Sequence, residues 1–294
     1  MAEIKKLIIP MAGLGTRFLP LSKVVPKEFW PLAGEPLIYY LLKEAVDSGI
    51  EQIIFVLSPD NKKILEYIKP SVKIEKILKE RKKERLLEDF KRFEESFKAI
   101  SFKYVLQKKP LGDGHAILQA ARLLRKDEPV AMFFADDIVQ SHKPCIGQLM
   151  ATFKTCQKPV LGMYKVAKES LRFYGTPAIE KIANRLYKIK ELIEKPEPGK
   201  ELSEFATMGR QILTSEVFAY LKKAKPNEKG EIILAEVYDK MLKEGQLIYG
   251  YEYEGKWVEC GNKLDWMKAN VYMSLTDPKN GPEIKKFLKD LKIV

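Results

Sequence analysis

The hydrophobic pattern of the chain begins with a continuous apolar run, residues 7–9, which leads into a turn that contains glycines. Such a run indicates a strand that is buried on both faces, as in the middle of a parallel sheet. Pro36 to Ser48 has apolar residues at helical spacing and is followed by Gly49, a common residue just past a helix end, and Glu51 to Ser58 is a second strand-like run. This order predicts a βαβ unit with a right-handed crossover and a ligand site at the carboxyl ends of its strands.

The remaining apolar segments predict further strands and closing helices. The expected strands are Ser101 to Gln107, Val130 to Ala135, Pro159 to Val166, Thr176 to Ile182 and Leu186 to Ile193. The expected helices begin at Gly230, run from Leu264 to Leu275, and run from Pro282 to Leu291. We found no internal repeat, low-complexity tract or flexible linker, so we expect residues 1–294 to form a single α/β domain.

Residues from about 72 to 98 are strongly charged, yet apolar side chains recur there at helical spacings. These are Ile74, Ile77, Leu78, Leu86, Leu87, Phe90, Phe93 and Phe97. The pattern predicts an amphipathic helical insertion whose charged face is solvated above an apolar stripe. A contact between subunits is a second use for such a stripe.

Composition limits the class of protein. With 294 residues and 46% hydrophobic content, the chain can bury a large core. Met1 to Lys6 shows no signal-peptide pattern and no apolar run reaches the length of a membrane span, so we expect a soluble, cytoplasmic protein without a membrane partner. Cys145, Cys156 and Cys260 are widely spaced, which is typical of reduced thiols.

The formal net charge of +12 favours an anionic partner, which could be nucleic acid, a membrane surface or a small polyanion. The sequence contains no nucleic-acid-binding motif, and much of the excess charge lies in scattered lysines of predicted surface helices. We therefore expect no nucleic-acid partner. The positive field then serves solubility and the attraction of small anionic substrates.

The turn after the first strand is the first candidate for chemistry. Gly13 and Gly15 lack Cβ atoms, which allows backbone N–H groups to approach an anion, and Arg17 and Lys27 add positive charge. The turn is neither a dinucleotide fingerprint, which would need glycine at Phe18, nor a P-loop. From these residues alone, a tight strand exit that merely requires glycine remains an alternative.

Three later segments also carry candidate chemistry. Gln107 precedes a glycine-rich turn with His115, and its amide offers both a donor and an acceptor to a pyrimidine edge. We interpret His115 as a structural hydrogen-bonding residue, because phosphoryl transfer between existing anions moves no proton. Asp136 and Asp137 end a predicted strand, where side chains alternate between faces, so only one of them is expected to face a given cleft.

The third segment ends in Glu194, Lys195 and Pro196, and Tyr174-Gly175 precedes it. A carboxylate can accept two hydrogen bonds from neighbouring sugar hydroxyls, and an ammonium group suits a phosphate dianion. A surface triplet without function is the alternative for these residues on their own.

Taken together, the motifs resemble one family. From residue 12 the chain reads Ala-Gly-Leu-Gly-Thr-Arg-Phe-Leu-Pro, followed by Pro26-Lys27-Glu28, and this is similar to the signature of the sugar-1-phosphate nucleotidyltransferases. The turn Pro-Leu-Gly-Asp-Gly-His-Ala from residue 110 resembles most closely that of the bacterial UTP–glucose-1-phosphate uridylyltransferases, and the charged insertion favours the same branch. Six motifs in the family's order span about residues 7 to 275.

Five positions depart from the family's pattern. Asp113 stands where leucine is usual, and Gln211 stands in place of an aromatic residue after Gly209-Arg210. Ala235 and Glu236 replace Thr-Asp after Gly230-Glu231-Ile232. Glu259 replaces the aspartate of an Asp-Cys-Gly segment.

The resemblance implies a Rossmann-like three-layer α/β/α fold with a mixed, mostly parallel central sheet, in which the N-terminal half binds the nucleotide and the C-terminal half the sugar phosphate. It implies the reaction of UTP with glucose 1-phosphate to give UDP-glucose and pyrophosphate, with Mg²⁺ as cofactor and a homodimer or homotetramer as the assembly. Alternatives are thymidylyl or other nucleotidyl transfer, a non-catalytic relative, and a nucleic-acid-binding role.

The resemblance also assigns roles to residues. Catalysis is assigned to Arg17, Lys27, Asp136 and Lys195. Nucleotide binding is assigned to Ala12, Gly13, Leu14, Gly15, Thr16, Glu28, Gln107 and Gly112. Sugar-phosphate binding is assigned to Asp137, Gly175, Glu194 and Lys195, and metal binding to Asp136 and Glu259.

Overall fold

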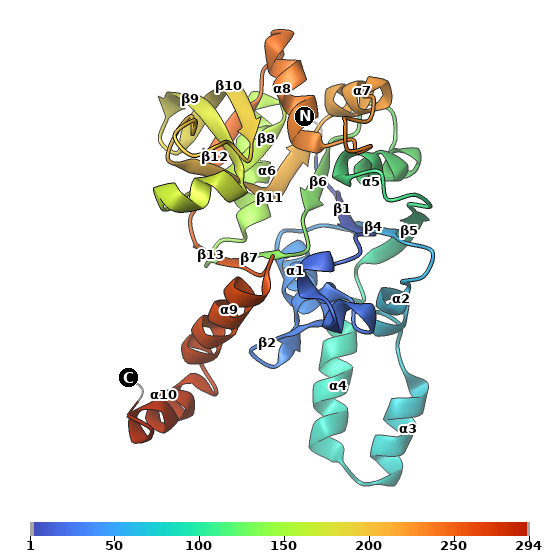
Figure 1. The fold of residues 1–294 in the computed structure, drawn as a ribbon. Coiled ribbons are helices and arrows are strands. Elements are labelled where there is room, and N and C mark those ends of the chain that lie inside the picture. The colour runs from blue at the N-terminus through green and yellow to red at the C-terminus, as the bar shows by residue number, and fades with distance from the viewer. Residues whose placement is uncertain (1–2, 293–294) are drawn as a thin grey trace.

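A nine-stranded sheet runs through the molecule (Figure 1). The computed structural model describes residues 3–292. Met1 and Ala2 lie outside the described residues, and they begin the segment that shows no signal-peptide pattern. The strands are β1 (Lys6–Met11), β4 (Gln52–Leu57), β5 (Ser101–Leu106), β6 (Val130–Phe133), β8 (Val160–Lys165), β9 (Gly175–Ala183), β10 (Leu186–Glu194), β11 (Phe205–Leu213) and β12 (Tyr249–Glu252). Two small ladders, β2 (Pro31–Leu32) with β3 (Glu35–Pro36) and β7 (Asp137–Gln140) with β13 (Lys256–Glu259), complete the strands.

The expected mixed sheet is confirmed, and its order is β5-β4-β1-β6-β11-β8-β12-β10-β9. The first four strands are mutually parallel, as are β8 and β12. β11 runs antiparallel to both neighbours, and β9 and β10 form an antiparallel hairpin. The hairpin is antiparallel because only two residues join its strands, whereas a parallel pair needs a long crossover.

Helices cover both faces of the sheet. They are α1 (Leu37–Asp47), α2 (Lys63–Tyr67), α3 (Val72–Glu80), α4 (Glu84–Ser96), α5 (Asp113–Ala120), α6 (Cys145–Cys156), α7 (Ser215–Lys223), α8 (Leu234–Lys243), α9 (Lys263–Thr276) and α10 (Gly281–Asp290). In β1, Leu7 and Ile9 join one hydrophobic core with α1 and α6, while Ile8 joins a second core with α5, α7 and α8. The apolar run of the first strand is therefore continuous because both of its faces are buried.

One helix begins later than expected. The segment from Gly230 to Ile233 is not helical, and α8 starts at Leu234. Ile232 donates its N–H to the carbonyl of Leu111 and accepts a hydrogen bond from the N–H of Gly114. Because these bonds hold Ile232 against another loop, its backbone groups are not available for a helical turn.

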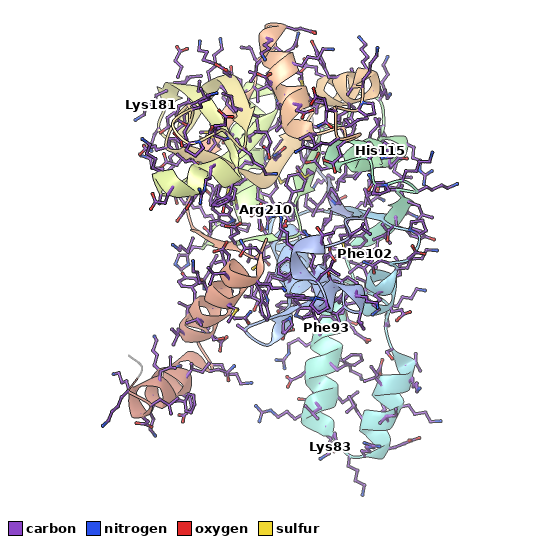
Figure 2. The ribbon with its side chains drawn as sticks, viewed as in Figure 1. Lys83, Phe93, Phe102, His115, Lys181 and Arg210 are labelled. Atoms are coloured by element: carbon purple, nitrogen blue, oxygen red, sulfur yellow. The ribbon has the colours of Figure 1, made fainter. Side chains whose placement is uncertain are left out.

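The charged insertion consists of two helices, α3 and α4, that form a hairpin projecting from the body (Figure 1). Figure 2 shows Lys83 at its tip and Phe93 near its base. There Phe93 packs edge-to-face on Tyr67 of α2, and Phe97 is buried. Ile74 and Leu86 remain 43% and 55% exposed, so the expected apolar stripe is covered only at its base.

α9 and α10 form a second projecting arm at the C-terminal end of the chain (Figure 1). The three cysteines are free thiols, as expected, and Cys145 and Cys260 are buried. Among residues 3–292, no helix is both long enough and apolar enough to cross a membrane.

Candidate active site

A cavity of about 730 Å³ opens where β1, β6 and β10 end. It brings together residues that lie far apart in the sequence. The predicted site residues that line it are Arg17, Lys27, Asp136, Asp137, Gly175, Glu194, Lys195 and Glu259. The position agrees with the general rule that ligands of open α/β sheets bind at the carboxyl ends of the strands.

The turn after β1 is built from short 3₁₀ segments, Thr16–Phe18, Leu21–Lys23 and Lys27–Phe29. Gly15 adopts a φ of +62°, which favours glycine, whereas a Cβ at Gly13 would meet no atom within 4 Å. The fold therefore requires glycine at position 15 but not at position 13.

The cation of Lys27 and the anion of Asp136 form an ion pair in the cavity, with 2.8 Å between Nζ and Oδ2. Burial alone would lower the pKa of Lys27, but the charges of Asp136, Glu28 and Asp137 outweigh it and raise that pKa. Burial opposes ionisation of Asp136 as well, yet Lys27 lowers its pKa below the ordinary value. Both groups are therefore charged at neutral pH.

Asp136 and Asp137 do not lie in one strand, and the expectation that only one of them faces the cleft is wrong. β6 ends at Phe133, Asp136 lies in a turn, and Asp137 begins β7, so both side chains line the cavity. Asp137 accepts hydrogen bonds of 2.8 Å from the N–H of Gly209 and from Nε1 of Trp257. Burial and the nearby charge of Asp136 raise the pKa of Asp137 to about 6.

Glu259 faces the same region from the end of β13, where it accepts a hydrogen bond from the hydroxyl of Tyr174. Burial is the main cause that raises its pKa to about 7. A Cβ added to Gly261 would lie 3.3 Å from Oε1 of Glu259 and 3.6 Å from both Oδ2 of Asp136 and Nη1 of Arg17. Two carboxylates and a guanidinium thus converge on a space that the glycine leaves free.

Two carboxylates near one space are the kind of donor set that Mg²⁺ uses when a substrate supplies further oxygens. Within residues 3–292, no three His, Cys, Asp or Glu side chains are arranged to hold a metal by themselves. Mg²⁺ is usually held by one or two carboxylates together with phosphate oxygens and waters. Asp136 and Glu259 provide the two carboxylates.

The register of β9 and β10 explains why Tyr174-Gly175 and Glu194-Lys195 lie together. β9 and β10 pair Gly175 with Glu194, and Lys195 follows at the strand end with its N–H bonded to the carbonyl of Tyr174. A Cβ at Gly175 would lie 2.5 Å from Oγ1 of Thr207 and 3.1 Å from Oε2 of Glu194. Only glycine therefore fits beside the carboxylate of Glu194, which explains why glycine follows Tyr174.

The residues assigned to nucleotide binding lie outside the cavity lining. These are Ala12, Gly13, Leu14, Gly15, Thr16, Glu28, Gln107 and Gly112. Glu28 is only 2% exposed, Oε1 of its carboxyl has no hydrogen-bond partner, and burial raises its pKa to about 7. A buried polar atom without a partner is rare, and it is expected where a ligand supplies the partner.

Gln107 and His115 form one hydrogen-bonded group beside the glycine turn. Nε2 of Gln107 donates to the carbonyl of Gly112 at 2.9 Å and lies 3.0 Å from Nδ1 of His115. Burial lowers the pKa of His115, which favours the neutral ring. These contacts agree with the structural interpretation of His115.

Several residues of the cavity have no motif in the sequence that marks them. They are Phe134, Leu192, Asp265 and Tyr238. Tyr238 donates a 2.7 Å hydrogen bond to Oε1 of Gln211 at the wall of the cavity. Tyr174 and Trp257 have roles that only the structure reveals, because Tyr174 donates a hydrogen bond to Glu259 and Trp257 donates one to Asp137.

The chain is similar to known proteins over nearly its whole length. A family model described as nucleotidyl transferase matches residues 6–274. The chain belongs to the nucleotidyl transferase family. It is 38% identical over 291 residues to the UTP–glucose-1-phosphate uridylyltransferase of Staphylococcus haemolyticus, covering 99% of each chain.

Two solved structures are similar to this member of the family. One is a UDP-glucose pyrophosphorylase complexed with UDP-glucose, with a TM-score of 0.81, 32% identity, and coverage of 92% of this chain and 98% of the other. The second is a UTP-bound enzyme of the same kind from Acinetobacter baumannii, with a TM-score of 0.87, 30% identity, and coverage of 98% and 99%. The expected resemblance to the uridylyltransferases is confirmed, since curated relatives with that name match over the full length.

Proposed function

We propose that this nucleotidyltransferase transfers a uridylyl group from UTP to glucose 1-phosphate and gives UDP-glucose and pyrophosphate. The observation that carries the proposal is the convergence of Arg17, Lys27, Asp136 and Lys195 on one cavity. The relatives named as uridylyltransferases, and the related structures with UTP or UDP-glucose, support the choice of substrates.

The reaction joins two anions, so cations are its main requirement. A phosphate oxygen of the sugar attacks the α-phosphorus of UTP in line, and pyrophosphate leaves without a covalent enzyme intermediate. At about 4 Å, two unit charges repel by roughly 4 kcal/mol at an effective dielectric constant near 20. Lys27 stabilises the α-phosphate, Arg17 the leaving pyrophosphate, and Lys195 the incoming sugar phosphate.

The nucleotide lies along the turn after β1. Backbone N–H groups of the segment from Ala12 to Thr16 contact the phosphates and the base. Glu28, Gln107 and Gly112 read the uracil, and the partnerless carboxyl oxygen of Glu28 supports this role. Gly175, Glu194 and Asp137 contact the sugar, and Glu194 accepts hydrogen bonds from its hydroxyls.

We assign Asp136 and Glu259 to the magnesium site. When bound there, Mg²⁺ would act as a Lewis acid and neutralise phosphate charge. The surroundings of Gly261 support a role for Glu259, because Oε1 of Glu259 and Oδ2 of Asp136 lie 3.3 Å and 3.6 Å from the position that a Cβ on Gly261 would take. Tyr174 orients the opposite oxygen of Glu259.

The role of Glu259 is tested by a magnesium titration of the activity. We expect Glu259→Gln to lose most activity at low Mg²⁺ and to recover part of it at high Mg²⁺. Glu259→Asp should keep most of the activity, because aspartate retains the negative charge that glutamine lacks. A glutamine variant that titrates like the wild type would show that Glu259 does not bind the metal.

Product analysis tests the function as a whole. Each of UTP, dTTP, ATP and GTP is offered with glucose, galactose or mannose 1-phosphate, and the nucleotide sugar and pyrophosphate are measured. We expect UTP with glucose 1-phosphate to have the highest kcat/KM. A higher value for dTTP would make the chain a thymidylyltransferase, and no product with any pair would favour a non-catalytic relative.

We also propose that the enzyme works in the cytoplasm as a homodimer or homotetramer. The free thiols support a reducing compartment. Exposed apolar residues on α9 support the association of subunits, and they are Leu264 at 60%, Met267 at 58% and Val271 at 57% exposure. Their spacing places them on one face of the helix.

A further inference from the structure

The side chain of Asp113, the residue after Gly112, connects the loop of Gly112 to the start of helix α8 by a hydrogen bond. Oδ1 of Asp113 accepts a 3.0 Å hydrogen bond from the N–H of Leu234, 121 residues further along the chain. The same oxygen accepts a 2.6 Å bond from the N–H of Gly114. One carboxylate oxygen therefore holds both segments.

Helix α8 has no cap of its own. Its N-cap residue is Ile233, whose apolar side chain cannot accept a hydrogen bond, so the first N–H groups of the helix need acceptors from elsewhere. Asp113 supplies one of them to Leu234. Burial raises the pKa of Asp113 to about 6, so its carboxylate is mainly charged at neutral pH.

The backbone of the Gly112 loop also lies close to the backbone just before α8. A Cβ on Gly112 would lie 2.5 Å from the carbonyl oxygen of Ile232, and one on Gly114 would lie 2.9 Å from it. Two backbone hydrogen bonds, from Ile232 to Leu111 and from Gly114 to Ile232, join the same segments. Any shift in the start of α8 is therefore passed directly to the loop of Gly112.

Both segments border the site. Ile233, Leu234, Ala235 and Tyr238, from the start of α8, line the cavity, and so does Asp113 itself. Glu194 and Lys195 are the charged groups of the sugar side that influence Asp113. Gly112 lies on the nucleotide side in the proposed function.

We propose that Asp113 is a positioning residue: by capping α8 it sets the distance between the base-reading loop and the sugar-side wall of the cavity. The proposal rests on the proposed function for the statement that the loop of Gly112 contacts the base. It goes beyond that function because it gives a role to a residue at which this chain departs from the family's motif.

The variants are Asp113→Leu, which removes the acceptor at similar size, and Asp113→Asn, which keeps a carbonyl oxygen in the same place. Amide hydrogen exchange without ligand is measured first. We expect exchange at Leu234 to be at least about tenfold faster in the leucine variant and within about twofold of wild type in the asparagine variant. If Asp113→Leu does not fold, Asp113→Ala takes its place.

Affinity for UTP and the KM for glucose 1-phosphate are measured next. We expect the leucine variant to bind UTP about tenfold more weakly and to show a raised KM, while the asparagine variant stays near wild type. Ser71→Ala is the matched control, because Ser71 caps α3 by accepting a bond from Ile74 far from the cavity. It should leave both constants unchanged.

Two results would overturn the proposal. One is unchanged UTP affinity in a folded leucine variant, and the other is an equal loss in the leucine and asparagine variants. A failure of the proposed function is recognised separately, because the wild type would then bind no UTP while the exchange experiment at Leu234 would still report on the cap.

Discussion

At the scale of single residues, the cavity holds opposite charges that are partly removed from water. Lys27 and Asp136 are paired at 2.8 Å, and each keeps the other charged despite burial. Lys195 differs, since its side chain is 53% exposed and its nearest partner is the neighbouring Glu194, at 3.3 Å. It is therefore free to meet a substrate phosphate.

Lys195→Ala is expected to lower kcat/KM for glucose 1-phosphate about a hundredfold or more, because a charge-assisted contact with a phosphate contributes about 3 kcal/mol. Steady-state kinetics at saturating UTP measures the change. Lys200→Ala is the control, since Lys200 pairs with Glu197 on the surface. Equal activity of the two folded variants would place Lys195 among the ordinary surface lysines.

Glu28 should make stability depend on pH. Burial raises its pKa from 4.5 to about 7, so the folded state binds more protons than the unfolded state between these values, and stability falls as pH rises through that window. Glu28→Gln removes this contribution, which amounts to at most about 3 kcal/mol. We expect the advantage of the glutamine variant over wild type to grow from pH 4.5 to pH 8 in urea unfolding. A constant difference would contradict the shift.

At the scale of elements, a buried ion pair joins β11 to α1. The guanidinium of Arg210 is fully buried and donates to the carboxylate of Glu44 through Nε and Nη2, at 2.9 to 3.2 Å. It also lies over the ring of Phe133, and Glu44 accepts a bond from the N–H of Ile146 at the start of α6. Figure 2 shows Arg210 in the middle of the molecule.

Arg210→Met should destabilise the fold by about 3–5 kcal/mol, because it leaves the charge of Glu44 buried without a partner. Combining it with Glu44→Leu should restore much of the loss. Lys43→Met on the same helix breaks only the exposed pair with Asp47 and should cost less than about 1 kcal/mol. Chemical denaturation measures all three, and similar costs for Arg210→Met and Lys43→Met would refute the role of the pair.

At the scale of the whole molecule, one sheet spans the N-terminal and C-terminal halves, and two helical arms project from the body (Figure 1). We propose that residues 1–294 unfold as one domain, since β6 and β11 join the halves in the middle of the sheet. The arms expose apolar residues that the body leaves uncovered. Association is the expected way to cover them.

Light scattering is expected to give the mass of a dimer or tetramer for the wild type. Met267→Glu combined with Val271→Glu should shift the mass toward the monomer, because it puts charges on the apolar face of α9. Ile182→Glu is the control, as Ile182 is 51% exposed but lies on β9, away from α9. A monomeric wild type would contradict the proposed assembly.

The sequence by itself determined seven of the nine strands of the main sheet and the membership of the family, but it did not predict β11, β12, α6 or α7. Apolar runs such as residues 7–9 indicate that both faces of β1 are buried. Helix ends such as Gly49 follow from local backbone preference. Neither prediction requires knowledge of a contacting segment. The motifs likewise identified most of the cavity's charged residues, because each motif is a short run of the sequence; Lys195, for example, stands directly after the end of β10.

Only the tertiary structure decided which residues of distant segments contact one another. The start of α8 depends on Leu111 and Asp113, the break after Phe133 lets both aspartates face the cavity, and Tyr174 meets Glu259 across 85 residues of sequence. These features follow from hydrogen bonds and close contacts between distant segments. Local periodicity carries no information about such partners, since they become neighbours only when the sheet has formed.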